Sequence, residues 1–133
     1  MFKVLLVDDS TIDITLIQDV LETYIPYSKS ITSFTDSVKA KEYYLQHDFD
    51  LVVTDLEMPE IDGFELIDCI KKHGKEPIIA ISGSHVNDNS TDTILYAANK
   101  SGADYVISKA TLYEDLARLL TNVCHDELVV KVN

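Results

Sequence analysis

Short apolar runs alternate along the chain with stretches in which apolar residues recur at helical spacing. Four of the runs are continuous and rich in β-branched residues, as is typical of parallel strands buried on both faces, and the run at 31–34 predicts a weaker strand. The runs lie at 4–7, 31–34, 51–54, 78–81 and 105–107. The expected helices begin after Ser10, at Asp36 or Ser37, after Gly63, after Asn89 and at Leu112. Five strands alternating with five helices predict an α/β domain with a parallel sheet and right-handed crossovers.

The expected helix ends follow from local chemistry. Ser10 is a candidate N-cap, and Asp13, three residues later, approximates the acidic member of a capping box. Pro26 ends that first helix, and Gly74 follows the third as a candidate C′ residue. The last helix is expected to reach about His125. We therefore expect one domain over 1–125 and an irregular tail over 126–133.

The composition indicates a single folded domain and limits the kinds of molecule that it is expected to bind. The chain has 133 residues, of which 46% are hydrophobic, enough for one domain with a buried core. Its formal net charge of −12 disfavours contact with nucleic acid or anionic membranes. Basic or mixed protein surfaces and cations are the expected partners.

Compartment is inferred from what the sequence lacks. Cys69 and Cys124 are too few and too far apart for a disulfide framework or a metal-binding spacing. No apolar run reaches the length of a membrane span, and the N-terminus has no signal-peptide pattern. We expect a cytoplasmic protein, and the start at Met1 with a short tail slightly favours a complete single-domain chain.

Polar residues stand where the expected strands end. The first strand ends in Asp8 and Asp9, the third in Asp55, the fourth in Ser82 and the fifth in Lys109. Parallel α/β sheets bind ligands at these carboxyl ends, and in the flavodoxin-like order 2-1-3-4-5 the first and third strands are neighbours. The three carboxylates would then meet in one pocket.

That pocket predicts metal-assisted phosphoryl transfer. Three adjacent carboxylates repel each other, and oxygen ligands suit Mg²⁺ better than zinc. One oxygen of Asp55 is then free to attack phosphorus and form an aspartyl phosphate. Mg²⁺, Lys109 and the Ser82 hydroxyl are the candidates for neutralising the moving group. Each feature alone has an ordinary structural explanation, but their joint occurrence at successive strand ends favours the functional interpretation.

At these residues the chain resembles the receiver domains of two-component response regulators, including the single-domain chemotaxis type. The resemblance runs over roughly 2–125, and its most specific part is the Asp-x-x-Met-Pro-x-x-x-Gly pattern that starts at Asp55. The matching segments are 4–10, 51–63, 77–83 and 102–109. This family has a flavodoxin-like (βα)5 sandwich with helices on both faces of the sheet.

The resemblance implies a role for each site residue. Asp55 is the expected phospho-acceptor, Ser82 and Lys109 contact the phosphoryl group, and Mg²⁺ is held by three carboxylates and a carbonyl. These ligands are Asp8, Asp9, Asp55 and the backbone carbonyl of Glu57. The implied phosphodonor is a histidine kinase or a histidine phosphotransfer domain, and the output is a changed surface for a downstream protein or for a homodimer. Such a domain catalyses its own phosphorylation and dephosphorylation but is not a separate enzyme.

Three departures from the family pattern concern the output. Ala110 stands where a proline, usually preceded by a cis bond, is common, so a trans bond is expected here. Val106 stands at the usual position of a switch aromatic, and Tyr105 should face the other side of the sheet. Because Val106 is short and stiff at χ1, we expect phosphorylation to act through the longer polar loop from Ser82 to Asn89.

Two other functions stay open on sequence alone. One is a degenerate receiver that binds partners without phosphorylation, although Asp8, Asp9, Asp55, Ser82 and Lys109 are all in place. The other is a phosphatase with an aspartate nucleophile, in which Glu57 would be the second acid. The absence of a cap domain and the Met58-Pro59 loop disfavour this second function.

Overall fold

The computed structural model describes residues 1–58, 62–83 and 101–132. Within that part of the chain the strands are β1 (Phe2–Val7), β2 (Lys29–Phe34), β3 (Leu51–Asp55), β4 (Ile78–Ser82) and β5 (Tyr105–Ser108). The helices are α1 (Thr11–Tyr24), α2 (Ser37–Tyr44), α3 (Gly63–His73) and α5 (Leu112–Val132), with a short 3₁₀ helix, η1 (Lys109–Thr111). The helix and the loop expected between Ser82 and Lys100 lie mostly outside the described residues.

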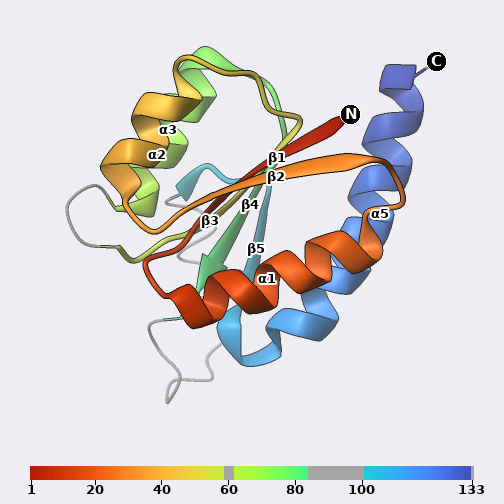
Figure 1. Cartoon of the computed structure of the whole chain (residues 1–133), viewed down its shortest axis with the longest axis horizontal. Helices are drawn as coiled ribbons and strands as arrows, with labels where there is room; N and C mark the ends of the chain where they lie inside the picture. The colour runs from red at the N-terminus through yellow and green to blue at the C-terminus, as the bar shows by residue number, and fades with distance from the viewer. Residues whose placement is uncertain (59–61, 84–100, 133) are drawn as a thin grey trace.

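The strands form one parallel sheet in the order β2-β1-β3-β4-β5, which confirms the expected topology (Figure 1). Apolar residues fill the central strands, and every residue of β3 and β4 is buried. The central strands therefore require a covering layer on each face.

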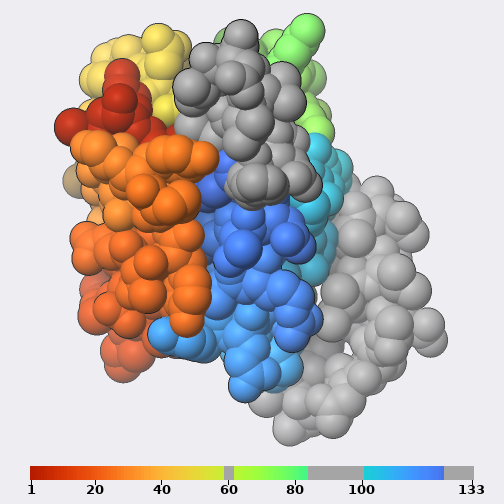
Figure 2. Space-filling model, turned by 90° about the vertical axis from the view of Figure 1, so that its right-hand side faces the viewer, coloured from red at the N-terminus to blue at the C-terminus, as the bar shows by residue number. Residues whose placement is uncertain are grey.

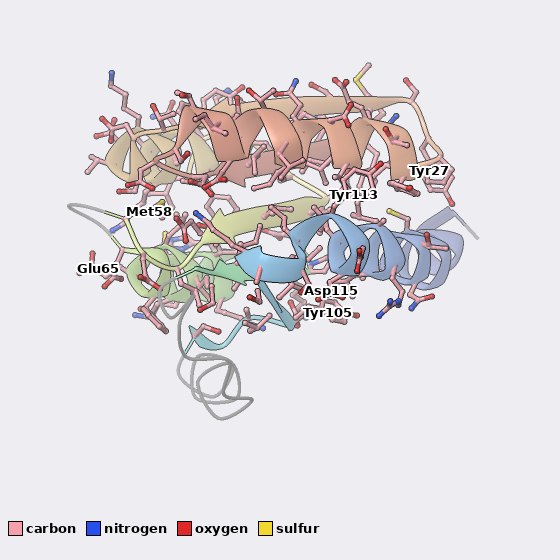
Figure 3. The ribbon with its side chains drawn as sticks, turned by 90° about the horizontal axis from the view of Figure 1, so that it is seen from below. Tyr27, Met58, Glu65, Tyr105, Tyr113 and Asp115 are labelled. Atoms are coloured by element: carbon pink, nitrogen blue, oxygen red, sulfur yellow. The ribbon has the colours of Figure 1, made fainter. Side chains whose placement is uncertain are left out.

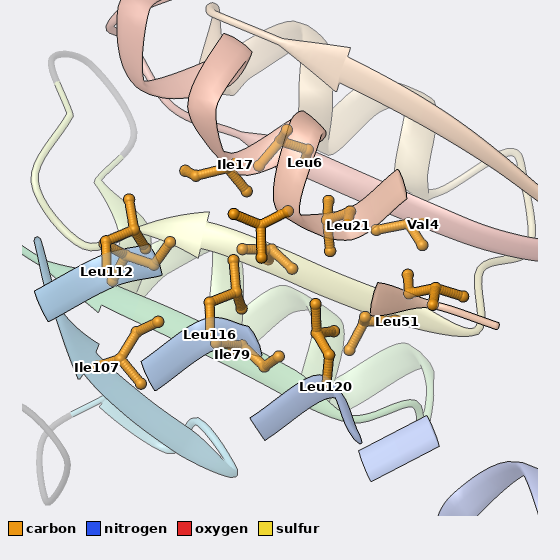
Figure 4. Close-up of a cluster of buried hydrophobic side chains, with 14 of the residues drawn as sticks. Val4, Leu6, Ile17, Leu21, Leu51, Ile79, Ile107, Leu112, Leu116 and Leu120 are labelled. Atoms are coloured by element: carbon orange, nitrogen blue, oxygen red, sulfur yellow. The ribbon is translucent and has the colours of Figure 1, made fainter. Parts of the chain in front are cut away.

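Helices supply those layers. On one face, α1 and α5 cover a cluster that includes Leu6, Ile17, Ile79 and Leu116 (Figure 4). On the other face, α2 and α3 cover a second cluster around Leu5, Val52 and Ile67. Figure 1 shows these two helix pairs on opposite sides of the sheet. The result is the three-layer sandwich expected from the sequence.

The helix pair on the first face is held together along its length. The outer surface of α5 lies beside the orange segment where α1 ends and β2 begins (Figure 2). Tyr113, near the beginning of α5, lies between α1 and α5 (Figure 3), and its ring meets that of Tyr24 edge-on at a centroid distance of 6.1 Å. This ring contact holds the end of α1 against the beginning of α5.

Helix α5 corrects the expected C-terminus. Residues 126–132 are helical rather than irregular, since α5 runs on to Val132 and its end extends past the sheet (Figure 1). A helix usually ends at a glycine or proline, and neither occurs after Leu112. The β-branched valines near the end lower helix propensity by only about 0.5 kcal/mol each. The expected irregular tail was therefore wrong.

Other helix ends differ in detail. Helix α2 ends at Tyr44, and Leu45 is its C-cap. Gly74 ends α3 in an extended conformation with φ −150°, so it is not the left-handed residue that the sequence suggested. Gly102 is left-handed, with φ 75°. Among the described residues, no helix is long and apolar enough to cross a bilayer.

Candidate functional site

The sheet register brings the acidic strand ends together. Val7 of β1 pairs with Thr54 of β3, so Asp8 and Asp55, the next residue in each strand, stand side by side. Asp9 follows directly, and one oxygen from each of the three carboxylates lies within 4.8 Å of the others. Asp8 and Asp55 are buried while Asp9 is exposed, so the group is open to solvent on one side only. The predicted meeting of the three carboxylates is confirmed.

Backbone amides orient the two buried carboxylates. Ser10 N donates to Asp8 Oδ1 at 2.9 Å, and Glu57 N donates to Asp55 Oδ1 at 3.2 Å. The second oxygen of Asp8, Oδ2, is buried and accepts no hydrogen bond from the described residues. It lies 3.4 Å from the Lys109 ammonium, close enough for attraction between the charges only. A buried carboxylate oxygen in this condition is costly unless a cation comes to it.

Gly63 fixes the path of the chain after β3. Its amide donates to the Leu56 carbonyl at 3.0 Å, which closes the loop back onto the strand end. A Cβ at this position would lie 2.5 Å from the Leu56 Cα and closer still to the Asp55 carbonyl oxygen. Both are backbone atoms that cannot turn aside. Only glycine therefore lets α3 begin so close to Asp55.

Lys109 follows β5, and its side chain approaches the carboxylates from that end of the sheet. Its stem passes over Gly83, where an added Cβ would lie 2.6 Å from the Lys109 Cδ. Its Nζ lies 2.8 Å from Asp13 Oδ2 and 3.2 Å from Asp55 Oδ2. Among the described residues, Lys109 supplies the ammonium that pairs with these acids. No described peptide bond is cis, so the Lys109–Ala110 bond is trans, as expected.

Asp13 is the site residue that sequence reasoning missed. The capping-box interpretation was half right: Asp13 N donates to the Ser10 hydroxyl at 3.3 Å, so Ser10 is the N-cap. The Asp13 carboxylate, however, binds Lys109 instead of turning back to the Ser10 amide, which donates to Asp8. Lys109 is 96 residues away in sequence, so no local pattern indicates this pair.

The remaining predicted residues lie around this centre. Ser82 ends β4 next to Ile81, the residue that pairs with Asp55, and is 8% exposed. Glu57 is exposed in the loop after β3, and ligation by its carbonyl stays a prediction. Val106 packs against the α2–α3 side and Tyr105 against the α1–α5 side, so the two face opposite ways, as expected.

Burial and crowding alter the acidity of the site. Burial raises the pKa of Asp55 to about 6, and the neighbouring charge of Asp8 adds to the rise. Burial likewise raises the pKa of Asp8. For Lys109, burial alone would lower the pKa, but the hydrogen bond to Asp13 and the charges of Asp55 and Asp8 raise it above its usual value. Lys109 is therefore charged at neutral pH, while Asp8 and Asp55 are harder to ionise than an ordinary aspartate.

The donor set fits a hard divalent cation. In the part of the chain that the structure describes, three carboxylates face one ammonium, and Asp8 Oδ2 accepts no hydrogen bond. Aspartate oxygens with a solvent-exposed side are the environment in which Mg²⁺ keeps several of its waters. Asp8, Asp9 and Asp55 are the residues that would hold it.

This acidity gives a pH-dependent prediction for the metal-free protein. A raised folded-state pKa means that protonated Asp55 stabilises the fold; this contribution is complete below about pH 4 and is lost as pH rises through about 6. Relative to Asp55→Asn, wild type should therefore lose on the order of 2–3 kcal/mol of unfolding free energy over that range. Urea unfolding in EDTA at several pH values measures the difference. Asp68→Asn, on the exposed face of α3, is the control, and a wild-type-minus-variant difference independent of pH would contradict the prediction.

Comparison with known proteins agrees with this geometry. The family profile of the response regulator receiver domain matches residues 4–121. The sensory transduction protein BceR of Halalkalibacterium halodurans is 31% identical over 109 residues, which cover 82% of this chain and 44% of that protein. The chain spans less than half the length of the curated relatives that it matches.

Solved structures share the fold. The signal receiver domain of a DNA-binding response regulator from Colwellia psychrerythraea superposes with a TM-score of 0.78 at 21% identity, covering 95% of this chain and all of that one. The receiver domain of a sensor histidine kinase from Pseudomonas aeruginosa has a TM-score of 0.73 at 19% identity, covering 94% and 98%, and holds a magnesium ion in its active site cleft. With its sheet order, its acidic strand ends and the profile match across most of its length, the chain belongs to the response regulator receiver domain family.

Proposed function

We propose that this receiver domain accepts a phosphoryl group on Asp55 in a Mg²⁺-dependent reaction and thereby switches a protein-binding surface. One observation carries the proposal. The Asp55 carboxylate lies between two acidic neighbours, Asp8 and Asp9, and an ammonium, that of Lys109. Phosphoryl transfer depends on such neutralisation around the moving group more than on covalent assistance.

Each residue of the site has its own role in the proposed phosphoryl transfer. One oxygen of Asp55 attacks phosphorus, and the bond from phosphorus to the leaving group of the donor breaks. Glu57 N, which donates to Asp55 Oδ1 at 3.2 Å, holds the carboxylate in orientation. Lys109, 3.2 Å from Oδ2, and the Ser82 hydroxyl neutralise the phosphoryl oxygens. Mg²⁺ held by Asp8, Asp9, Asp55 and the Glu57 carbonyl supplies charge neutralisation for the same group.

Donor and output follow from the family. Receiver domains of two-component systems interact with histidine kinases and downstream targets, so the phosphodonor is a phosphohistidine on a kinase or phosphotransfer domain. The output is a downstream protein or a homodimer formed on phosphorylation. A bare receiver is not a separate enzyme, and the exposed Glu57 side chain adds no buried second acid for phosphatase chemistry.

The test is phosphorylation of the wild-type chain by acetyl phosphate, with and without Mg²⁺. Intact-mass measurement should show one phosphoryl group per chain with Mg²⁺ and almost none in EDTA. A phosphorylated phosphotransfer domain should give the same product faster. Equal labelling in EDTA would refute the Mg²⁺ dependence. No labelling by either donor would refute the proposal and favour a phosphate-independent binding domain.

A further inference from the structure

The shortest polar contact of Lys109 is to a residue with no role in the proposed chemistry. Its Nζ lies 2.8 Å from Asp13 Oδ2, against 3.2 Å for Asp55 and 3.4 Å for Asp8. Asp13 belongs to the first turn of α1, while Lys109 begins η1 after β5. The pair therefore joins two separate segments of the chain across the mouth of the site.

We propose that Asp13 is a positioning residue that holds the Lys109 ammonium toward α1 and competes for it with a phosphoryl group on Asp55. This inference rests on the proposed function. An ammonium has three donors, and Asp13 occupies one that a phosphoryl oxygen would otherwise receive.

The route of Lys109 makes this competition direct. Because its stem lies against Gly83, the ammonium enters the pocket between Asp13 and Asp55 and contacts both. The Lys109 and Asp13 side chains are 24% and 28% exposed, so water screens their attraction only in part. Asp13 thus weakens the phosphorylated state and, through its charge, strengthens the hold of the site on a cation.

Asp13→Asn tests the inference, because it removes the charge with little change of shape. The probe is beryllofluoride, a phosphoryl mimic, titrated at saturating Mg²⁺ and followed by ¹⁹F NMR. We expect Asp13→Asn to bind it about threefold to fivefold more tightly, the range of a partly exposed ion pair. Mg²⁺ alone should bind more weakly to the same variant. A purely structural role would not move the two affinities in opposite directions.

Three further variants make the result specific. Asp13→Glu should restore wild-type affinity, since its carboxylate still reaches the lysine. Asp19→Asn, the same charge change on an exposed position of α1, should leave both affinities unchanged. In a Lys109→Ala background, Asp13→Asn should raise the beryllofluoride affinity only a little. The ammonium for which Asp13 and the phosphoryl mimic compete is absent there.

The outcomes separate the two proposals. A wild-type chain that fails to bind beryllofluoride would refute the proposed function and this inference together. A wild-type chain that binds it, with Asp13→Asn no tighter, would refute the inference alone. An equal gain in the Lys109→Ala background would also refute it, since the effect would then be general charge and not competition for the lysine.

Discussion

Asp55→Asn will lose all labelling by acetyl phosphate while the variant stays folded. The carboxamide keeps the shape of the side chain but is a poor nucleophile, and the other carboxylates of the site, Asp8 and Asp9, are expected to hold Mg²⁺ and not to accept the phosphoryl group. The loss should be complete, not partial. Intact mass after incubation with acetyl phosphate and Mg²⁺ measures it, and peptide mapping of the wild type should find the group on Asp55.

Two variants control this result. Ser82→Ala should slow labelling without abolishing it, because Ser82 is proposed to contact the moving group but not to accept it. Asp68→Asn, an exposed carboxylate paired with Lys72 on α3, should label like wild type. A phosphoryl group found on Ser82 or Asp9, or retained by Asp55→Asn, would show that the acceptor is misassigned.

Magnesium will raise the unfolding midpoint of the wild-type chain in a concentration-dependent way. The carboxylates of Asp8, Asp9 and Asp55 lie within 4.8 Å of one another, and Asp8 Oδ2 has no donor, so the metal-free site is electrostatically strained. A ligand that binds only the folded state stabilises it by about 2.7 kcal/mol at one hundred times its dissociation constant. Thermal unfolding across a Mg²⁺ titration, with EDTA as the reference, measures the effect.

Asp9→Asn separates Mg²⁺ binding from the repulsion between carboxylates in the same experiment. Removing one charge should raise the metal-free stability slightly, because Asp9 is exposed, yet it should abolish most of the gain from Mg²⁺. Asp68→Asn should keep the full gain. An unfolding midpoint that stays constant over the titration would mean that these carboxylates do not form a magnesium site.

The sequence by itself determined the layered fold and the acidic centre. Continuous apolar runs require strands buried on both faces, and parallel strands deliver their next residues to one edge. Asp8 and Asp55 therefore meet wherever β1 and β3 are neighbours, as the observed pairing of Val7 with Thr54 confirms. The opposite orientation of Tyr105 and Val106 follows equally from the alternation of side chains along a strand.

The sequence pattern gave the wrong end for the last helix, α5. Residues 126–132 were expected to be irregular, yet α5 extends to Val132. No glycine or proline follows Leu112 to end the helix. Because the packed part of α5 is already helical, each further residue extends the helix without a new nucleation step. Helix ends depend on such small balances, which pattern alone does not resolve.

Only the tertiary structure decided how the charges pair. Asp13 stands at a capping position, and its local sequence gives no reason to expect more. Its carboxylate binds Lys109 because the folded chain brings the first turn of α1 next to the segment that follows β5. A long lysine side chain takes whichever carboxylates lie within its reach, and that choice is set by the distances between elements, which residue spacing does not encode.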